Sequence, residues 1–297
     1  MRLVIAAILC CLSSIEAASH RYIHPGMFVL PHSHRVLDSF VTLRVRLAII
    51  TEDWAAVDAV IQEGIKAGAF PGAVALVGSP AGEVYSKAFG AYTYGDAPPF
   101  VPPGSGSPPS MKLDTRFDMA SCTKVVATLT AVGILYDLKL ISLDMKVSDP
   151  ALLGPAFANN GKDDITLLNC LLHNAGYPPD PVPNYWDPAF GCPQTTKPMP
   201  AEDFSCRDQI FTSLLNQTLA APIGSVYVYS DLSFLTLMWV VGKVVQTHAT
   251  DLRIRPSDLL PGCASGSASD TQCYYEVFVR RYVFQEVRIR FVYADRY

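Results

Sequence analysis

A single predicted β-hairpin is the feature that most restricts the fold of this chain. Ala73–Val77 is a short apolar run, Val84–Phe89 alternates between apolar and polar residues, and the turn residues Ser79–Gly82 lie between them. Two strands cannot bury both faces of a sheet or cover its open edges, as a five-stranded sheet does. The hairpin therefore does not complete a sheet by itself.

The segments around the hairpin carry helical patterns. Trp54, Val57, Val60, Ile61 and Ile65 recur at helical spacing, which predicts an amphipathic helix from Asp53 that ends at Gly68. The other predicted helices are Met119 to about Tyr136, which is mostly apolar and expected to be buried, the apolar segment Leu232–Val245, and Tyr274–Val287. The stretch from about Leu140 to Asp208 is rich in prolines and predicts loops.

Composition excludes several classes of protein. The chain has 297 residues, of which 50% are hydrophobic and 17% charged, and its net charge is −4. These values favour a compact globular protein and argue against disorder, a coiled coil or a polybasic surface for nucleic acid or membrane. No glycine-rich nucleotide motif and no CxxC pair occurs, and the pair His32 and His34 has no ligand cluster nearby. We expect no cofactor, no metal and no nucleic-acid partner.

The beginning of the chain predicts export. Arg2 is followed by the apolar run Leu3–Leu12 and by small residues at Ala17 and Ala18, so residues 1–18 are interpreted as a secretory signal peptide. The apolar run is about half the roughly 20 residues of a membrane span, and no transmembrane segment is predicted. Residues 19–52 form an arm of unknown role. We expect a protein that is secreted or otherwise exported through the secretory pathway.

The cysteines and one sequon agree with export. Six cysteines remain after the signal: Cys122, Cys170, Cys192, Cys206, Cys263 and Cys273. An even number in an oxidising compartment predicts disulfides, and the loop-rich surroundings of Cys192, Cys206, Cys263 and Cys273 suit loop-closing bridges, without fixing their connectivity. Asn216-Gln217-Thr218 is a glycosylation sequon.

Ser121-Cys122-Thr123-Lys124 is the first candidate catalytic motif. Residues three apart share a helix face, so the Lys124 amine is expected within hydrogen-bond reach of the Ser121 hydroxyl. A lysine can activate a serine only if its pKa is lowered, and burial and the positive end of the helix dipole both act in that direction. The Ser121 backbone N–H is a candidate oxyanion donor. The alternative is that Ser121 merely caps a helix.

Tyr229-Ser230-Asp231, just before the apolar helix, is the second candidate motif. In the functional interpretation, Tyr229 relays a proton between the Ser121 oxygen, Lys124 and the leaving group, and Asp231 pairs with Lys124. In the structural interpretation, Ser230 or Asp231 is an N-cap, and both interpretations can hold together. A Ser-His-Asp triad is poorly supported because no GxSxG motif occurs and only His173 and His248 lie beyond the arm.

These motifs, in this order, resemble the beta-lactamase-related serine hydrolases. The resemblance rests on Pro71-Gly72-Ala73-Val74, Ser121-xx-Lys124, Leu171-Leu172-His173-Asn174-Ala175-Gly176 and Tyr229-Ser230-Asp231. That family contains class C beta-lactamases, DD-peptidases and related esterases. The resemblance implies Ser121 as the nucleophile, Lys124 as the base, Tyr229 as the catalytic tyrosine and Asp231 where the family has Asn or Asp. It implies that His173 shapes a turn near the site.

The resemblance also sets the expected fold and domain organisation. It implies an α/β (α+β) fold of the beta-lactamase/DD-peptidase type, with a mainly antiparallel sheet flanked by helices and a helical insertion domain between about Leu140 and His248. Residues 53–287 would form this domain, and residues 288–297 a divergent tail. The reaction implied is hydrolysis of a small-molecule or peptide ester or amide through an acyl-enzyme on Ser121.

One family motif is missing from the sequence. The Lys- or His-x-Gly strand, which supplies an oxyanion N–H and binds a substrate carboxylate, does not occur between Tyr229 and Tyr297, and the family's last strands would lie beyond that point. Two alternatives to an active hydrolase therefore stay open. The chain is either a catalytically inactive binding or scaffold protein of the same fold, or a truncated fragment of a longer hydrolase. Among active enzymes, a cell-wall peptidase is the alternative to an esterase.

Overall fold

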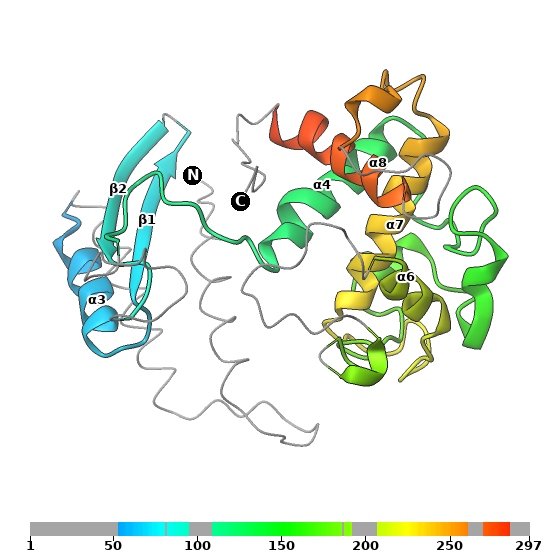
Figure 1. The fold of residues 1–297 in the computed structure, drawn as a ribbon, viewed down its shortest axis with the longest axis horizontal. Helices are drawn as coiled ribbons and strands as arrows, with labels where there is room; N and C mark the ends of the chain where they lie inside the picture. The colour runs from blue at the N-terminus through cyan, green and yellow to red at the C-terminus, as the bar shows by residue number, and fades with distance from the viewer. Residues whose placement is uncertain are drawn as a thin grey trace. The chain divides into compact units, whose positions relative to one another are not determined.

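The computed structural model describes residues 53–80, 82–94, 109–185, 187–191, 207–260 and 270–285. The chain divides into two compact units, Met1–Ala120 and Ser121–Tyr297 (Figure 1). The predicted signal peptide (1–18), the arm (19–52) and the divergent tail (288–297) lie outside the described residues.

The first unit contains the predicted helix and hairpin. Helix α3 spans Ala55–Lys66, and strands β1 (Gly72–Ser79) and β2 (Gly82–Gly90) pair antiparallel, with Gly72 opposite Gly90 and a register shift at Val77/Gly78. The amphipathic helix and the hairpin predicted from the sequence are therefore confirmed. Both strands extend beyond the predicted segments.

Side chains of β2 attach the hairpin to α3. The Tyr85 hydroxyl donates to the Asp58 carboxylate at 2.5 Å, Lys87 forms an ion pair with the same carboxylate, and Trp54 stacks on the Tyr85 ring at 4.8 Å between centroids. Tyr85, Lys87 and Phe89 alternate along β2 and so share one face of the strand. That face of the hairpin is covered by α3.

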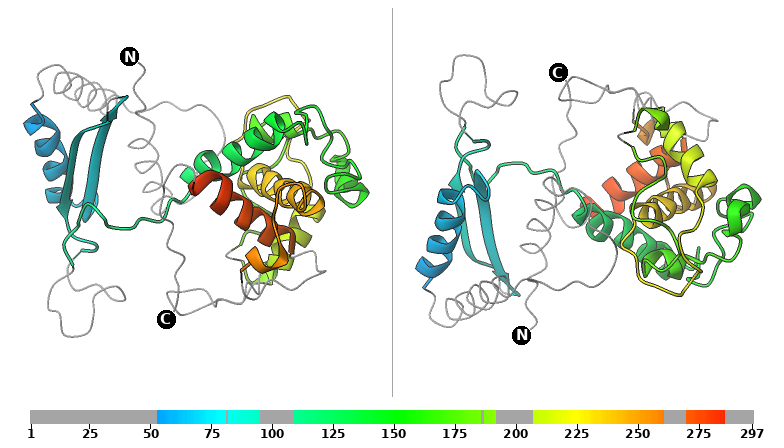
Figure 2. Two further views of the ribbon diagram at one scale, coloured as in Figure 1. Left: turned by 90° about the horizontal axis from the view of Figure 1, so that it is seen from above. Right: turned by 90° about the horizontal axis from the view of Figure 1, so that it is seen from below.

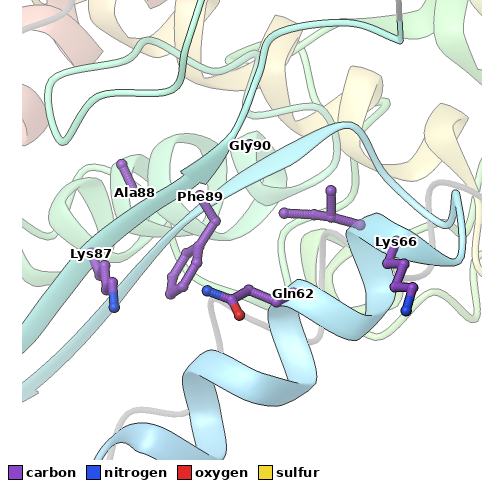
Figure 3. A pocket seen from close by; sticks show the side chains of 7 residues that line it. Gln62, Lys66, Lys87, Ala88, Phe89 and Gly90 are labelled. Carbon is purple, nitrogen blue, oxygen red and sulfur yellow. The ribbon is translucent and has the colours of Figure 1, made fainter.

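An open pocket of about 360 Å³ lies between α3 and β2 (Figure 3). Gln62 and Lys66 come from the helix, and Lys87 and Phe89 come from the strand. None of the residues predicted to be catalytic lines this pocket.

The second unit is helical. It contains a π-helix at Lys124–Leu129, α4 (Thr130–Asp137), α5 (Leu167–Leu171), α6 (Arg207–Asn216), α7 (Asp231–Thr247), α8 (Asp270–Phe278) and a second π-helix at Val279–Phe284. Short 3₁₀ helices lie at Pro155–Gly161, Pro188–Phe190 and Pro256–Asp258. The prediction of a loop-rich middle segment agrees with the short helices there.

Helix α7 is the centre of the second unit. It packs against α4, α5, α6 and α8, and Figure 2 shows this helical group from two further directions. Most of its residues are buried, including Trp239, whose ring lies 4.4 Å from that of Phe211 on α6. At Gly242 a Cβ atom would lie 2.0 Å from the Thr271 carbonyl oxygen, so only glycine allows α7 and α8 to approach this closely. The predicted apolar helix Leu232–Val245 is thus confirmed as a core helix.

The helix predicted to begin near Met119 differs from the prediction in two ways. Ala120 has φ of +41°, a left-handed conformation, so helical structure begins only at Cys122, and it is a π-helix from Lys124 to Leu129. Ala131 and Leu135 are buried on one face of α4, whereas Val125 and Leu129 of the preceding π-helix are exposed. The prediction of a buried helix is therefore correct for one face only. No helix in the described part of the chain has the length and hydropathy to cross a bilayer.

Candidate active site

Ser121 and Lys124 lie together at the start of the first helix of the second unit. The Lys124 ammonium donates to the Ser121 hydroxyl oxygen at 3.0 Å, and the Lys124 backbone N–H donates to the Ser121 carbonyl at 3.1 Å. Ser121 is exposed. The predicted proximity across one helical turn is therefore observed, and the hydroxyl faces a side chain that can influence its chemistry.

The backbone on both sides of Ser121 is unusual. Ala120 is a non-glycine residue with positive φ, and the π-helix that begins at Lys124 replaces the ordinary α-helical pattern. Strained residues and π-helical turns are both enriched at functional sites. None of the described residues accepts a hydrogen bond from the Ser121 N–H, which leaves this donor open.

Lys124 also interacts with Asp231 and Tyr229. The Lys124 Nζ atom lies 2.6 Å from the Asp231 carboxylate and 4.9 Å from the centroid of the Tyr229 ring. The Lys124 side chain is 15% exposed and that of Asp231 is 43% exposed. The structure therefore brings Ser121, Lys124, Tyr229 and Asp231 together within the second unit, as the sequence predicted.

The charge state of Lys124 corrects a sequence prediction. Burial lowers the pKa of Lys124, but hydrogen bonding to Asp231 and to Tyr229 and the Asp231 charge outweigh it, so the net pKa is raised. The prediction of a lowered pKa was wrong because it considered only desolvation and the helix dipole. Lys124 is an ammonium in this arrangement, and it donates to Ser121 rather than accepting from it.

His173 holds the segment that carries Tyr229. The Ser230 backbone N–H donates to the His173 Nδ1 atom at 3.0 Å, and the Tyr229 ring lies 4.7 Å from the imidazole. Burial and the Lys124 charge lower the pKa of His173, against the opposing effect of Asp231. The neutral imidazole is therefore the acceptor that this hydrogen bond requires. The implied turn-shaping role of His173 agrees with this contact.

Backbone hydrogen bonds also join the segment around His173 to the segment that carries Tyr229 and Asp231. Val228 N–H donates to the His173 carbonyl at 2.8 Å, and Asp231 N–H donates to the Pro179 carbonyl at 2.9 Å. Gly176, between these two acceptors, has φ of +88°, and a Cβ atom there would lie 2.4 Å from the Ala221 carbonyl oxygen. Glycine is therefore required at this position. The motif around His173–Gly176 thus positions Tyr229 and Asp231 through the main chain.

The N-cap interpretations are only partly correct. Ser230 occupies the N-cap position of α7, yet its hydroxyl donates to the Pro178 carbonyl at 2.6 Å and no side chain caps the helix. The Ser121 hydroxyl likewise accepts from Lys124. Both serines therefore use their hydroxyls for contacts with other segments or side chains.

Sequence reasoning missed two residues near this cluster, Asp180 and Tyr185. Burial and the Asp231 charge raise the pKa of Asp180, while Lys124 opposes this effect. Burial and the charges of Asp231 and Asp180 raise the pKa of Tyr185. The signal that could have found them is the proline-rich stretch Pro178-Pro179-Asp180-Pro181, which directly follows the Leu171–Gly176 motif.

The metal and disulfide predictions concern other parts of the chain. In the described ranges no three His, Cys, Asp or Glu side chains form a group that could hold a metal, and His32 and His34 lie outside those ranges. Cys170 is a buried free thiol, and burial raises its pKa. Cys192, Cys206 and Cys263 lie outside the described residues, so the predicted disulfides stay a prediction.

Known proteins provide independent comparisons. The family model described as Beta-lactamase matches residues 57–252. An N-acetylmuramyl-L-alanine amidase of Bacillus subtilis (strain 168) is 31% identical over 199 residues, which cover 63% of this chain and 40% of the relative. The chain thus spans less than half the length of that curated relative.

A solved structure was also matched. It is the crystal structure of a candidate beta-lactamase from Bacteroides dorei DSM 17855, with 20% identity, a TM-score of 0.44, and coverage of 65% of this chain and 47% of the other. The family match covers most of the chain and contains both the Ser121–Lys124 and the Tyr229–Asp231 segments. The chain belongs to the beta-lactamase family, and the α/β fold class expected from the resemblance is confirmed.

Proposed function

We propose that the protein is a serine hydrolase that cleaves an ester or amide through an acyl-enzyme on Ser121. The observation that carries the proposal is the 3.0 Å hydrogen bond between the Lys124 ammonium and the exposed Ser121 hydroxyl, beside Tyr229 and Asp231. A serine needs an adjacent group that manages its proton before it can attack a carbonyl carbon. The four side chains supply a nucleophile, a cation and a proton relay.

Tyr229 transfers the proton in this mechanism. As the Ser121 oxygen bonds to the carbonyl carbon, its proton passes to the Tyr229 oxygen, and the Tyr229 proton passes to the departing amine or alcohol. Lys124 stays an ammonium because Asp231 raises its pKa, and it stabilises the negative charge that develops on the two oxygens. Water then attacks the acyl-enzyme, the same groups return the proton, and the acid product leaves.

The Ser121 N–H is the proposed oxyanion donor. It belongs to the residue directly before the helical segment and has no acceptor among the described residues. Removing one such donor typically costs about 10²–10³-fold in rate. The substrate class proposed is a small-molecule or peptide ester or amide, and the similarity to the Bacillus subtilis relative, an amidase, supports the amide. The proposal includes export, which the apolar run Leu3–Leu12 supports.

Covalent labelling tests the nucleophile. Purified protein is treated with an uncharged fluorophosphonate, and the labelled residue is located by peptide mass spectrometry. We expect labelling at Ser121 that disappears in Ser121→Ala. The matched control is Ser225→Ala, because Ser225 is also exposed and its hydroxyl donates only to the Pro222 carbonyl. Labelling that persists in Ser121→Ala would refute the assignment.

The same experiment separates the alternatives. A sample that unfolds cooperatively and yet takes up no fluorophosphonate would favour an inactive binding or scaffold protein. A labelled sample leaves the choice between esterase and peptidase, which small esters and D-alanyl peptides assayed side by side would resolve.

A further inference from the structure

Asp180 follows two prolines whose carbonyls bind the segment that carries Tyr229 and Asp231. The Pro179 carbonyl, one residue before it, accepts from the Asp231 N–H at 2.9 Å, and the Pro178 carbonyl accepts from the Ser230 hydroxyl at 2.6 Å. Pro181 follows it and restricts the Asp180 backbone to extended conformations. The position of Asp180 is therefore fixed relative to Asp231 by two hydrogen bonds and a stiff backbone.

The Asp180 carboxylate differs from that of Asp231 in its partners. Asp231 forms an ion pair with Lys124, whereas Asp180, which is solvent-accessible although its carboxylate is partly desolvated, makes no hydrogen bond or ion pair with any described residue. The hydrogen bond from the Asp231 N–H to the Pro179 carbonyl holds the Asp180 backbone next to Asp231. The electrostatics agree, because Asp231 and Lys124 both shift the pKa of Asp180, and both carboxylates raise the pKa of Tyr185. Asp180 is thus a carboxylate without an ion-pair partner among the described residues, and it follows the proline that is hydrogen-bonded to Asp231.

The charges around Ser121 do not cancel. Lys124 is balanced by Asp231, and His173 is neutral because its pKa is lowered. Among the charged groups of the second unit that interact with Lys124, the Asp180 charge remains, so this cluster repels an anionic substrate group and attracts a cationic one. Aromatic residues add to the preference: Tyr229 is 45% exposed and Tyr227 is 69% exposed, and the faces of aromatic rings attract cations.

We propose that Asp180 is a specificity-determining residue, which binds a positively charged ammonium group of the substrate beside Ser121. The inference rests on the proposed function, because it concerns the substrate of the same site. It assigns the site a cationic ester or amide rather than a substrate with a free carboxylate.

A pair of substrates of the same shape tests this inference. Acetylthiocholine carries a quaternary ammonium, and 3,3-dimethylbutyl thioacetate replaces that nitrogen by carbon, so both give the same acetyl-enzyme. The ratio of their kcat/KM values is measured for the wild type and for Asp180→Asn. We expect the ratio to fall about tenfold in the variant, which is the effect of one partly screened charge close to the ammonium. High salt is expected to weaken the wild-type preference.

Matched variants control for net charge and for folding. Asp163→Asn makes the same charge change at an exposed aspartate outside the cluster and should leave the ratio unchanged. Asp180→Glu keeps the charge and should keep most of the preference, which separates a charge effect from damage to the proline-rich segment. An unchanged ratio in Asp180→Asn would overturn the inference.

Fluorophosphonate labelling keeps this failure distinct from a failure of the proposed function. If wild type and Asp163→Asn are labelled at Ser121 but the ratio of kcat/KM values is the same in Asp180→Asn as in wild type, only the inference about specificity is overturned. If the folded wild type is not labelled, the proposed function is overturned and the inference with it.

Discussion

Lys124 and Lys162 are two shielded lysines of the helical unit, and they differ in what accepts their hydrogen bonds. The Lys124 side chain is 15% exposed, and its ammonium contacts the Asp231 carboxylate and the Ser121 hydroxyl. Lys162 is fully buried, and its Nζ donates to three backbone carbonyls, those of Asn159 at 2.6 Å, Leu215 at 3.0 Å and Gln217 at 2.8 Å. The Lys124 ammonium is therefore bound by a charged carboxylate, whereas the Lys162 ammonium is bound by neutral backbone carbonyls.

The two environments shift the lysine pKa values in opposite directions. Burial lowers the pKa of Lys162 from 10.5 to about 8. Burial also acts on Lys124, but Asp231 and Tyr229 outweigh it and raise the pKa. The comparison teaches that a carboxylate at 2.6 Å decides the direction in which the pKa of a shielded lysine shifts, and that burial alone does not identify a catalytic base.

The surroundings of the two lysines also indicate different roles, structural for Lys162 and chemical for Lys124. Lys162 binds the carbonyls at the C-terminal end of α6, where a cation is favoured, and neighbouring Asn160 donates to the Asn216 carbonyl at 2.8 Å. Lys162 therefore joins α6 to the 3₁₀ segment at Pro155–Gly161. Lys124 instead faces an exposed serine, where its charge can act on a substrate.

The largest expected effect is the loss of activity in Lys124→Met. The Ser121 hydroxyl loses its cationic neighbour, and we expect the fluorophosphonate labelling rate to fall about thousandfold, which corresponds to about 4 kcal/mol. The control is Lys146→Met, which removes an exposed lysine paired with Asp164. A labelling rate within tenfold of wild type would show that Lys124 is not part of the chemistry.

Lys162→Met should have the next largest effect, on stability. Three carbonyls lose their donor inside the fold, and we expect the free energy of unfolding to fall by about 3 kcal/mol. Urea denaturation followed by circular dichroism measures this change. Lys146→Met, an exposed pair, should cost about 1 kcal/mol or less. Equal stability of Lys162→Met and wild type would show that the Lys162 hydrogen bonds do not stabilise the fold, and the structural role that distinguishes Lys162 from Lys124 would be wrong.

Much of this comparison could be predicted from the sequence and part could not. The Ser121–Lys124 contact follows from local helical spacing, and the hairpin and α7 follow from apolar periodicity. These features depend on neighbours in the chain, so a single sequence carries them.

The remainder depends on distant contacts. The His173–Ser230 hydrogen bond joins residues 57 positions apart, and the Asp180 backbone lies next to Asp231 because the Pro179 carbonyl accepts from the Asp231 N–H. The raised pKa of Lys124 is a balance between burial and an ion pair, whose sign depends on a distance that spacing does not give. The π-helix at Lys124–Leu129 left no recognisable pattern in the apolar residues.

Asp231→Asn sharpens the comparison because it makes Lys124 resemble Lys162. Without the carboxylate, burial is opposed only by Tyr229, so the pKa of Lys124 falls. If the ammonium form is required, the labelling rate declines at high pH, and this decline moves to lower pH in the variant. The measurement is the pH dependence of the labelling rate in both proteins. A rate that instead rises with pH, and rises at lower pH in the variant, would identify neutral Lys124 as the base.

The smallest expected effect is on the pH dependence of stability, and it comes from Lys162. Its pKa is about 8 in the folded protein and 10.5 when solvated, so between these values the unfolded chain holds a proton that the folded chain has released. Stability therefore rises with pH across this window and is flat below it, because the unfolded state binds more protons there. Urea unfolding at pH 7, 9 and 10.5 measures wild type minus Lys162→Met, which cancels the other titrating groups. This difference should grow in favour of wild type from pH 8 upward. A constant difference would mean that Lys162 keeps its proton in the fold across this pH range, because its three carbonyl acceptors offset the effect of burial.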